Sequence, residues 1–294
     1  MKNQYFGDVG DFGKYGLLSK FLGNGLRLGI NWYLTEDDER NDGKFIEYFN
    51  KPEFKICDEE LHDFLNRCVL DNKRNVKELN HFKRFQSIPI YDTLLKIDDI
   101  KALSPEGRNQ REKFRDDWFN RSLEKLSNCD VIFCDPDNGI ETKSLSKTSK
   151  DSVKYIFSNE IIGMINRGYT LIIYNHRDRS KESDYKQRFK EIYQEINGKA
   201  KLRVLRFSRY NVRDYLFFIQ KKHKNIIDTQ INHLPEYRGI GLGSCLLKRA
   251  IGHAKSQNGI EKVELEVFES NENAVKFYQK HGFFFFLIQH QIIG

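Results

Sequence analysis

Short apolar runs alternate along the chain with stretches in which apolar residues recur every three or four positions. The runs are rich in β-branched and aromatic residues, as buried strands are. They cover residues 26–34, 130–134, 169–174, 202–207 and 215–220. Helical spacing marks residues 151–166 and 181–196, and a glycine follows each stretch closely. This alternation predicts an α/β fold with a Rossmann-like, mostly parallel sheet. We expect helices on both faces and an antiparallel pair at one edge.

Residues 51–128 have a different character, because they are rich in Lys, Arg, Asp, Glu and Asn. Their apolar residues recur at helical spacing, for example at Leu61, Phe64, Leu65 and Cys68. We therefore expect an insertion of charged helices within a domain that spans residues 1–224.

A second unit is expected at residues 225–294. Residues 226–233 have strand character, and a glycine-rich turn then leads into a helical stretch at 244–256. An alternating strand follows at 262–268, a further helix begins at Asn271, and an apolar run at 283–288 ends the unit. The order predicts a β-α-β-α-β unit.

Composition narrows the class of protein. The 23 Phe and 14 Tyr supply core material, although 31% of the residues are charged. The five cysteines form an odd, widely spaced set without a CxxC pair, which indicates neither a disulfide framework nor a metal site. Because no apolar run reaches the roughly 18 residues of a membrane span, we expect a cytoplasmic protein without membrane contact.

The positive charge lies mostly in the larger domain. The chain carries 49 Lys+Arg against 42 Asp+Glu, but residues 235–294 hold only 7 and 6 of these. Residues 203–224 interleave arginines and lysines with aromatic side chains, an arrangement that can contact phosphates and stack on bases. A nucleic-acid partner of this domain is therefore one expectation, and a solvated edge strand guarded by positive charges is the other.

The strongest chemical signal is a glycine-rich loop between an expected strand and an expected helix. Glycines let the backbone approach a ligand, and successive free N–H groups at the start of a helix suit a pyrophosphate. A plain turn without a ligand is the alternative. The loop consists of Arg238, Gly239, Ile240, Gly241, Leu242, Gly243 and Ser244.

With the sequence LEVFESNENAVKFYQKHGF downstream, this loop resembles the GNAT superfamily of N-acetyltransferases. The resemblance implies that residues 238–244 hold the pyrophosphate of acetyl-CoA and that Asn271 binds its pantetheine arm. It also implies that Tyr278 protonates the leaving thiolate as a general acid, with an amine as acceptor. It covers only residues 225–290, half of that fold. We therefore expect the upstream domain or a second copy of the chain to complete the sheet.

A second polar cluster, FCDPDNGIE, ends the expected strand at 130–134. Ligands of open α/β sheets bind at the carboxyl ends of the strands, where Asp135, Asp137 and Asn138 would meet His176 from the next strand. Such groups can bind a metal, act as a base or hold a ribose. A capped turn is the alternative, since Asp, Pro, Asn and Gly all form turns.

The opening residues 7–14, GDVGDFGK, and the DPDN loop at 135–138 resemble class I methyltransferases that modify adenine in ribosomal RNA. The resemblance implies S-adenosylmethionine as cofactor and a nucleic-acid substrate. Asp137 stands where that family has a proline, and Asn138 stands where it has an aromatic residue. A metal-dependent nuclease-like domain is equally compatible with this cluster.

These observations predict an acetyl-CoA-dependent N-acetyltransferase fused to a methyltransferase-like domain. The alternative is an S-adenosylmethionine-dependent nucleic-acid methyltransferase, or a metal-dependent nuclease-like domain, joined to a non-catalytic GNAT remnant. A chain in which neither half is catalytic is the third expectation.

Overall fold

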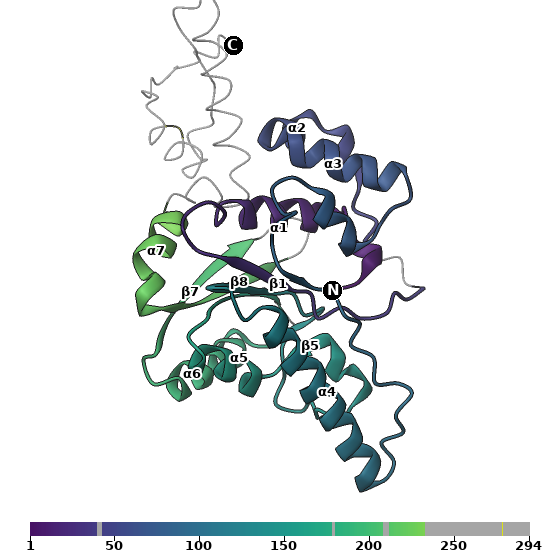
Figure 1. The fold of residues 1–294 in the computed structure, drawn as a ribbon, viewed down its shortest axis with the longest axis vertical. Coiled ribbons are helices and arrows are strands. Elements are labelled where there is room, and N and C mark those ends of the chain that lie inside the picture. Colours follow the sequence, from purple (N-terminus) through teal and green to yellow (C-terminus); the bar gives the residue numbers. More distant parts are fainter. Residues whose placement is uncertain (40–42, 178–179, 208–211, 233–277, 279–294) are drawn as a thin grey trace, which may run out of the picture.

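The computed structural model describes residues 1–39, 43–177, 180–207, 212–232 and 278 (Figure 1). A six-stranded sheet in the order β2-β1-β3-β6-β8-β7 forms its centre. The strands are β1 Leu28–Asn31, β2 Ile90–Tyr91, β3 Val131–Cys134, β6 Thr170–His176, β7 Ala200–Phe207 and β8 Arg213–Gln220. From β2 to β6 all neighbours are parallel, whereas β8 is antiparallel to both β6 and β7. The expected mostly parallel α/β sheet with an antiparallel edge is confirmed.

The antiparallel strand is inserted within the sheet. The chain leaves β6, forms the edge strand β7, and returns as β8 between the two. Ile172 of β6 and Val204 of β7 therefore pair with the neighbouring residues Phe217 and Leu216 of β8. This return lets a short connection join two antiparallel strands at the edge of a parallel sheet.

Helices cover both faces of the sheet, and Figure 1 shows α1 to α3 on one side and α4 to α6 on the other. The helices are α1 Val9–Ser19, α2 Pro52–Cys57, α3 Glu59–Leu70, α4 Pro105–Lys125, α5 Ser158–Asn166, α6 Glu182–Glu195 and α7 Lys224–Asn232. Short 3-10 helices lie at Asn3–Tyr5, Glu47–Asn50, Val76–His81, Lys150–Lys154 and Lys221–His223. A separate parallel pair joins β4 Gly139–Ile140 to β5 Tyr155–Ile156.

Each face of the sheet has its own apolar core. Successive side chains of a strand point to opposite faces, so Phe133 packs with α1 and α3, while Ile132 and Cys134 pack with α4, α5 and α6. A strand buried on both faces needs apolar residues at every position. The sequence of β3, Val131–Cys134, is apolar at every position, as burial on both faces requires.

Three expectations about elements were wrong in part. Residues 151–166 were expected as one helix, but the 3-10 helix Lys150–Lys154 and β5 precede α5. The insertion at 51–128 contains the expected helices, but it also supplies β2, which pairs in parallel with β1. A strand of two residues is too short to show a periodicity. Residues 226–233 were expected as a strand, yet α7 spans Lys224–Asn232. Ile227 and Ile231 pack from one face of this helix against the core, and the short apolar run does not distinguish the two structures.

The expected unit at 225–294 lies, beyond α7 and apart from Tyr278, outside the described residues. Ile227 of α7 is buried in the core that Phe217 of β8 also lines. The division of the chain at residue 225 stays a prediction.

Candidate functional site at the carboxyl edge of the sheet

A buried ionic cluster lies where β1 and β3 end. Lys14 of α1 places its Nζ atom 2.6 Å from Asp135 Oδ2 and 2.8 Å from Asp11 Oδ1. Lys14 is 3% exposed and Asp135 is 2% exposed, so water screens this cluster little. The two motifs noted in the sequence, at 7–14 and 135–138, therefore meet here although 121 positions separate Lys14 from Asp135.

The cluster favours a charged lysine. Burial alone lowers the pKa of Lys14, but Asp11 and Asp135 together raise it well above its usual value. Asp11 is held by further donors, because Tyr15 Oη donates to its Oδ2 at 2.9 Å and the Gly7 amide does so at 3.3 Å. A buried charge with this many partners is compatible with a stable fold.

Asp8 caps the helix that carries Lys14. Its carboxylate accepts a hydrogen bond from the Asp11 amide at 2.9 Å, which satisfies one of the free N–H groups of the first turn. Burial, and next the charge of Asp11, raise the pKa of Asp8 from 3.8 to about 7. A carboxyl group with such a pKa can accept or donate a proton near neutrality.

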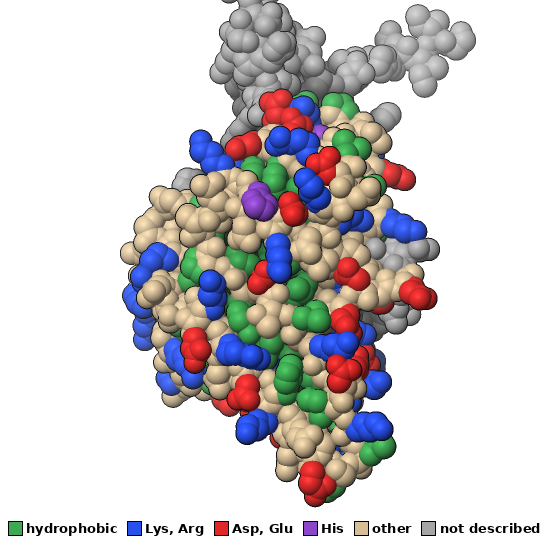
Figure 2. Space-filling view, turned by 45° about the vertical axis from the view of Figure 1, so that its right-hand side comes forward, with side chains coloured by type: hydrophobic (Ala, Val, Ile, Leu, Met, Phe, Trp, Pro, Cys, Tyr) green, Lys and Arg blue, Asp and Glu red, His purple; other side chains and the backbone are tan. Residues whose placement is uncertain are grey.

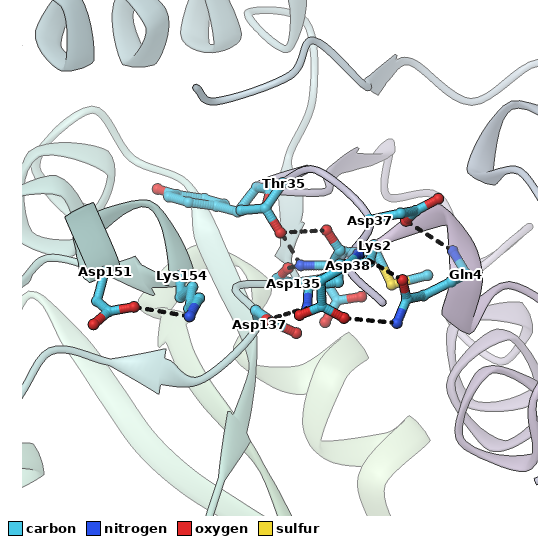
Figure 3. Close-up of polar contacts among 11 residues, drawn as sticks. Lys2, Gln4, Thr35, Asp37, Asp38, Asp135, Asp137, Asp151 and Lys154 are labelled. Atoms are coloured by element: carbon cyan, nitrogen blue, oxygen red, sulfur yellow. Dashed lines mark hydrogen bonds and ion pairs between the residues drawn. The ribbon is translucent and has the colours of Figure 1, made fainter. Parts of the chain in front are cut away.

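Residues 1–4 lie against the loop that follows β1 (Figure 3). Lys2 Nζ is 2.6 Å from Asp38 Oδ2 and 3.9 Å from Asp137 Oδ2, and the Gln4 amide donates to Asp37 Oδ1 at 3.0 Å. The Thr35 amide donates to the carbonyl of Met1 at 2.9 Å. The carboxylates at this edge are thus partly neutralised by the chain itself.

The site residues expected from the sequence lie around this cluster in different roles. Asp135 binds Lys14, and Asp137 faces Lys2. The Asn138 amide donates to the Lys154 carbonyl at 2.8 Å, so the backbone of Asn138 is part of the pairing that leads into β4.

His176 ends β6 near the same edge. Its ring lies edge-on to that of Tyr174, with 5.9 Å between centroids. Burial, and next the charge of Arg213, lower the pKa of His176 well below its usual value, so the imidazole is neutral. A neutral imidazole can accept a proton or bind a polar group.

Local sequence patterns do not show the contacts that several residues of this cluster make. Asp11 and Lys14 belong to the quoted opening motif, but their contact with Asp135 depends on the sheet. Lys2 and Asp38 give no signal apart from their charge, because charged residues at a chain start and in a loop are ordinarily solvated. The spacing of Asp11 and Lys14, which puts both on one face of a helix, is the one local hint.

Within the described part of the chain, no group of three or more His, Cys, Asp or Glu side chains is placed to hold a metal ion. None of the helices in the described ranges is long and apolar enough to cross a membrane. The residues expected to hold acetyl-CoA, Arg238 to Ser244 and Asn271, lie outside the described residues. Tyr278 is helical and partly exposed.

Comparison with known families adds one finding about the C-terminal part. Residues 158–283 match the Acetyltransferase (GNAT) family. The matched range contains the glycine-rich loop, Asn271 and Tyr278, and it supports the GNAT resemblance of the C-terminal part. It begins with α5, upstream of the expected unit, and so includes β6, β7 and β8 of the six-stranded sheet. No curated protein and no solved structure matches the chain.

Proposed function

We propose that the chain is an N-acetyltransferase that uses acetyl-CoA through its C-terminal part. The observation that carries the proposal is the glycine-rich loop at residues 238–244 within the range that matches the GNAT family. Successive backbone N–H groups ahead of a helix suit the pyrophosphate of a coenzyme. Acetyl-CoA would supply an acetyl group activated as a thioester.

The chain's own residues would bind the coenzyme and protonate its leaving sulfur. The backbone of residues 238–244 would hold the phosphates, and the Asn271 side chain would hydrogen-bond the amide-rich pantetheine arm. As the acceptor amine forms its C–N bond and the C–S bond breaks, Tyr278 Oη would give its proton to the sulfur. The proton that the amine nitrogen loses would pass to water, and Tyr278 would regain a proton from water. The acceptor is an amine of a small molecule or a protein.

Calorimetry with CoA and acetyl-CoA on the full chain tests this function. Gly241→Asp adds a carboxylate to the loop, so we expect it to weaken binding at least about tenfold through repulsion of the phosphates. Gly163→Asp is the matched control, because a Cβ added to Gly163 in the described domain would contact only the flexible end of Arg167, at 3.4 Å. Failure of the unsubstituted chain to bind either compound would overturn the proposal.

A second candidate function concerns the carboxyl edge of the sheet. The contact between Lys14 and Asp135 joins the two motifs that resemble class I methyltransferases. The carboxylates of Asp38 and Asp137 lie at the same edge of the sheet, beside Lys2. Carboxylates favour a cationic ligand, and S-adenosylmethionine carries a sulfonium. In this proposal the upstream domain binds S-adenosylmethionine and modifies nucleic acid.

Thermal unfolding with each cofactor separates the two candidates. A compound that binds only the folded chain raises its stability with concentration. If S-adenosylmethionine binds at this edge, its stabilising effect is reduced in Asp137→Asn and kept in Gly241→Asp. Stabilisation by acetyl-CoA is expected to show the reverse pattern. An unsubstituted chain that S-adenosylmethionine leaves unchanged would rule out the second candidate alone.

A further inference from the structure

Basic side chains gather at the edge of the sheet opposite the candidate site. They come from the segments at the amino ends of β1, β6 and β7, and from the segment that follows β8. We call them the amino-edge basic surface: Arg27, Arg167, Lys199, Lys201, Lys221, Lys222 and Lys224. All seven side chains are exposed.

Contacts tie these segments together. Lys199 Nζ donates to Asn166 Oδ1 at 2.7 Å, next to Arg167. A Cβ added to Gly168 would lie 3.8 Å from Lys222 Nζ. Ala200 pairs with Gln220 across β7 and β8, which brings the preceding Lys199 near the following Lys221. Four of the cations therefore share one surface.

Some of the basic side chains are neutralised locally. Asp228 of α7 lies 3.0 Å from Arg203, 3.4 Å from Lys224 and 3.7 Å from Lys201. Arg27 pairs with Asp130 at 2.9 Å. The carboxylates of Asp130 and Asp228 therefore neutralise one group of cations. A second group of cations does not contact either carboxylate.

That second group has no carboxylate partner within the described ranges: Arg167, Lys199, Lys221 and Lys222. The Arg167 guanidinium reaches a carbonyl of its own helix, Gly163 O, at 3.4 Å. On the face that Figure 2 shows, acidic and basic side chains are interspersed over much of the surface. The amino edge thus holds a local excess of positive charge.

Three of the lysines lie at the start of a helix, a position that itself favours anions. Lys221, Lys222 and Lys224 surround the start of α7, where the helix dipole is positive and favours anions. Lysines at this end repel both the dipole and one another. A polyanion bound across them would relieve the repulsion and gain contacts with every cation.

The surface suits phosphates in water better than a membrane. Most exposed large apolar side chains of the described residues, such as Leu70, Leu94 and Leu103, come from other segments, and Val204 lies further along β7 than Lys201. Membrane-surface binding requires apolar side chains that enter the lipid in addition to charge. A nucleic acid needs only cations spaced along its backbone.

We infer that the amino-edge basic surface binds the phosphate backbone of nucleic acid without reading its sequence. The surface lies at the opposite edge of the sheet from Asp135, so it anchors the chain and leaves the candidate site free. This inference concerns a partner of the upstream domain and does not depend on acetyl transfer.

Binding of the full chain to labelled duplex DNA and labelled single-stranded RNA of mixed sequence, measured across a salt series, tests the inference. The test variant is Lys199→Glu/Lys221→Glu/Lys222→Glu. The matched control is Lys77→Glu/Lys83→Glu/Lys113→Glu, which reverses three exposed lysines elsewhere and changes the net charge equally. Circular dichroism checks that both variants fold, and a Lys→Gln triple replaces any that does not.

We expect the unsubstituted chain to bind at least one nucleic acid and to lose affinity as salt rises. The test variant is expected to bind at least about tenfold more weakly, with a salt slope lower by about 2 to 3 phosphate contacts. The control is expected to change binding by less than about threefold, since its lysines lie outside the surface.

Three results would overturn the inference. The unsubstituted chain could fail to bind both nucleic acids, or the two triple variants could weaken binding equally, which would make net charge the cause. Vesicles of phosphatidylserine and phosphatidylcholine supply the third result. Vesicle binding that only the test variant loses, with nucleic-acid binding unchanged, would assign the surface to an anionic membrane.

Discussion

Lys14 shows how strongly one side chain can depend on its surroundings. Its ammonium group is buried between Asp11 and Asp135, at 2.8 and 2.6 Å. Taking three charges from water is costly, and the close pairing offsets that cost only while all partners are present. In the sequence, Lys14 is one lysine among polar residues. In the structure, its two ion pairs hold the buried cluster of the site together.

Lys14→Met should lower the free energy of unfolding by about 3–5 kcal/mol, because it leaves two carboxylates buried without their counter-charge. Urea unfolding measures the change. Lys55→Met is the control, since the Lys55 pair with Asp63 lies at the surface, where water screens the charges, and we expect a much smaller loss. Equal losses in the two variants would contradict the buried-cluster account.

Asp8 should make stability depend on pH. Its pKa is raised from 3.8 in the unfolded chain to about 7 in the fold. The folded state therefore binds this proton more tightly, so the stabilisation is complete below pH about 4 and is lost as the pH rises towards about 7.

Asp8→Asn keeps a capping side chain but cannot ionise. Relative to the unsubstituted chain, its stability should therefore improve as the pH rises through the same interval, on the order of 2–4 kcal/mol in total. Urea unfolding at several pH values measures this difference. A difference that is constant with pH would show that Asp8 does not titrate in this range.

At the scale of elements, a second buried ion pair joins α4 to α5 on the face of the sheet opposite α1. Arg115 of α4 donates to Glu160 of α5 through two nitrogens, at 2.7 and 3.0 Å. The same guanidinium donates to the Ser152 and Tyr155 carbonyls, at 2.9 and 2.7 Å, and Tyr33 Oη donates to Glu160 at 3.2 Å. The pair thereby connects α4 and α5 with the segment around β5 and the end of β1.

Arg115→Met should destabilise the chain by about 3–5 kcal/mol, because the Glu160 carboxylate then stays buried without a cation. Thermal and urea unfolding measure the loss. Lys143→Met removes one partner of an exposed pair with Glu191, and we expect a much smaller loss because water screens this pair. A small effect of Arg115→Met would show that water reaches Glu160.

Some elements could be predicted from their own residues, whereas others depend on pairing with distant parts of the chain. β3 and β6 were predictable, because strands buried on both faces are apolar at nearly every position. β2 was missed, since two residues carry no period, and its place beside β1 comes from pairing across the chain. The interval 226–233 was misread because a short run with three isoleucines fits a strand or a helix.

At the scale of the whole molecule, the proposed acetyl-CoA loop and the amino-edge basic surface belong to different parts of the chain. The surface depends on side-chain charge, whereas a glycine-rich loop binds phosphates through backbone N–H groups. The two proposals can therefore fail separately.

Lys199→Glu/Lys221→Glu/Lys222→Glu should bind acetyl-CoA within about twofold of the unsubstituted chain, because the proposed loop holds phosphates through backbone N–H groups that these substitutions leave in place. Calorimetry with acetyl-CoA measures this. Gly241→Asp should in turn keep its affinity for nucleic acid. Loss of acetyl-CoA affinity in the lysine variant would show that the surface and the loop share one ligand.

The sequence by itself determined the fold class, most strands of the sheet and the GNAT resemblance, because apolar periodicity and a glycine-rich motif are local properties of the chain. Only the tertiary structure decided that Lys14 meets Asp135 and that Asp8 has a pKa of about 7. It also separated the basic side chains of residues 203–224, pairing Arg206 with Asp214 and placing Lys221 and Lys222 at the amino edge. These outcomes depend on strand order, burial and partners far away in the sequence, and local patterns do not carry them.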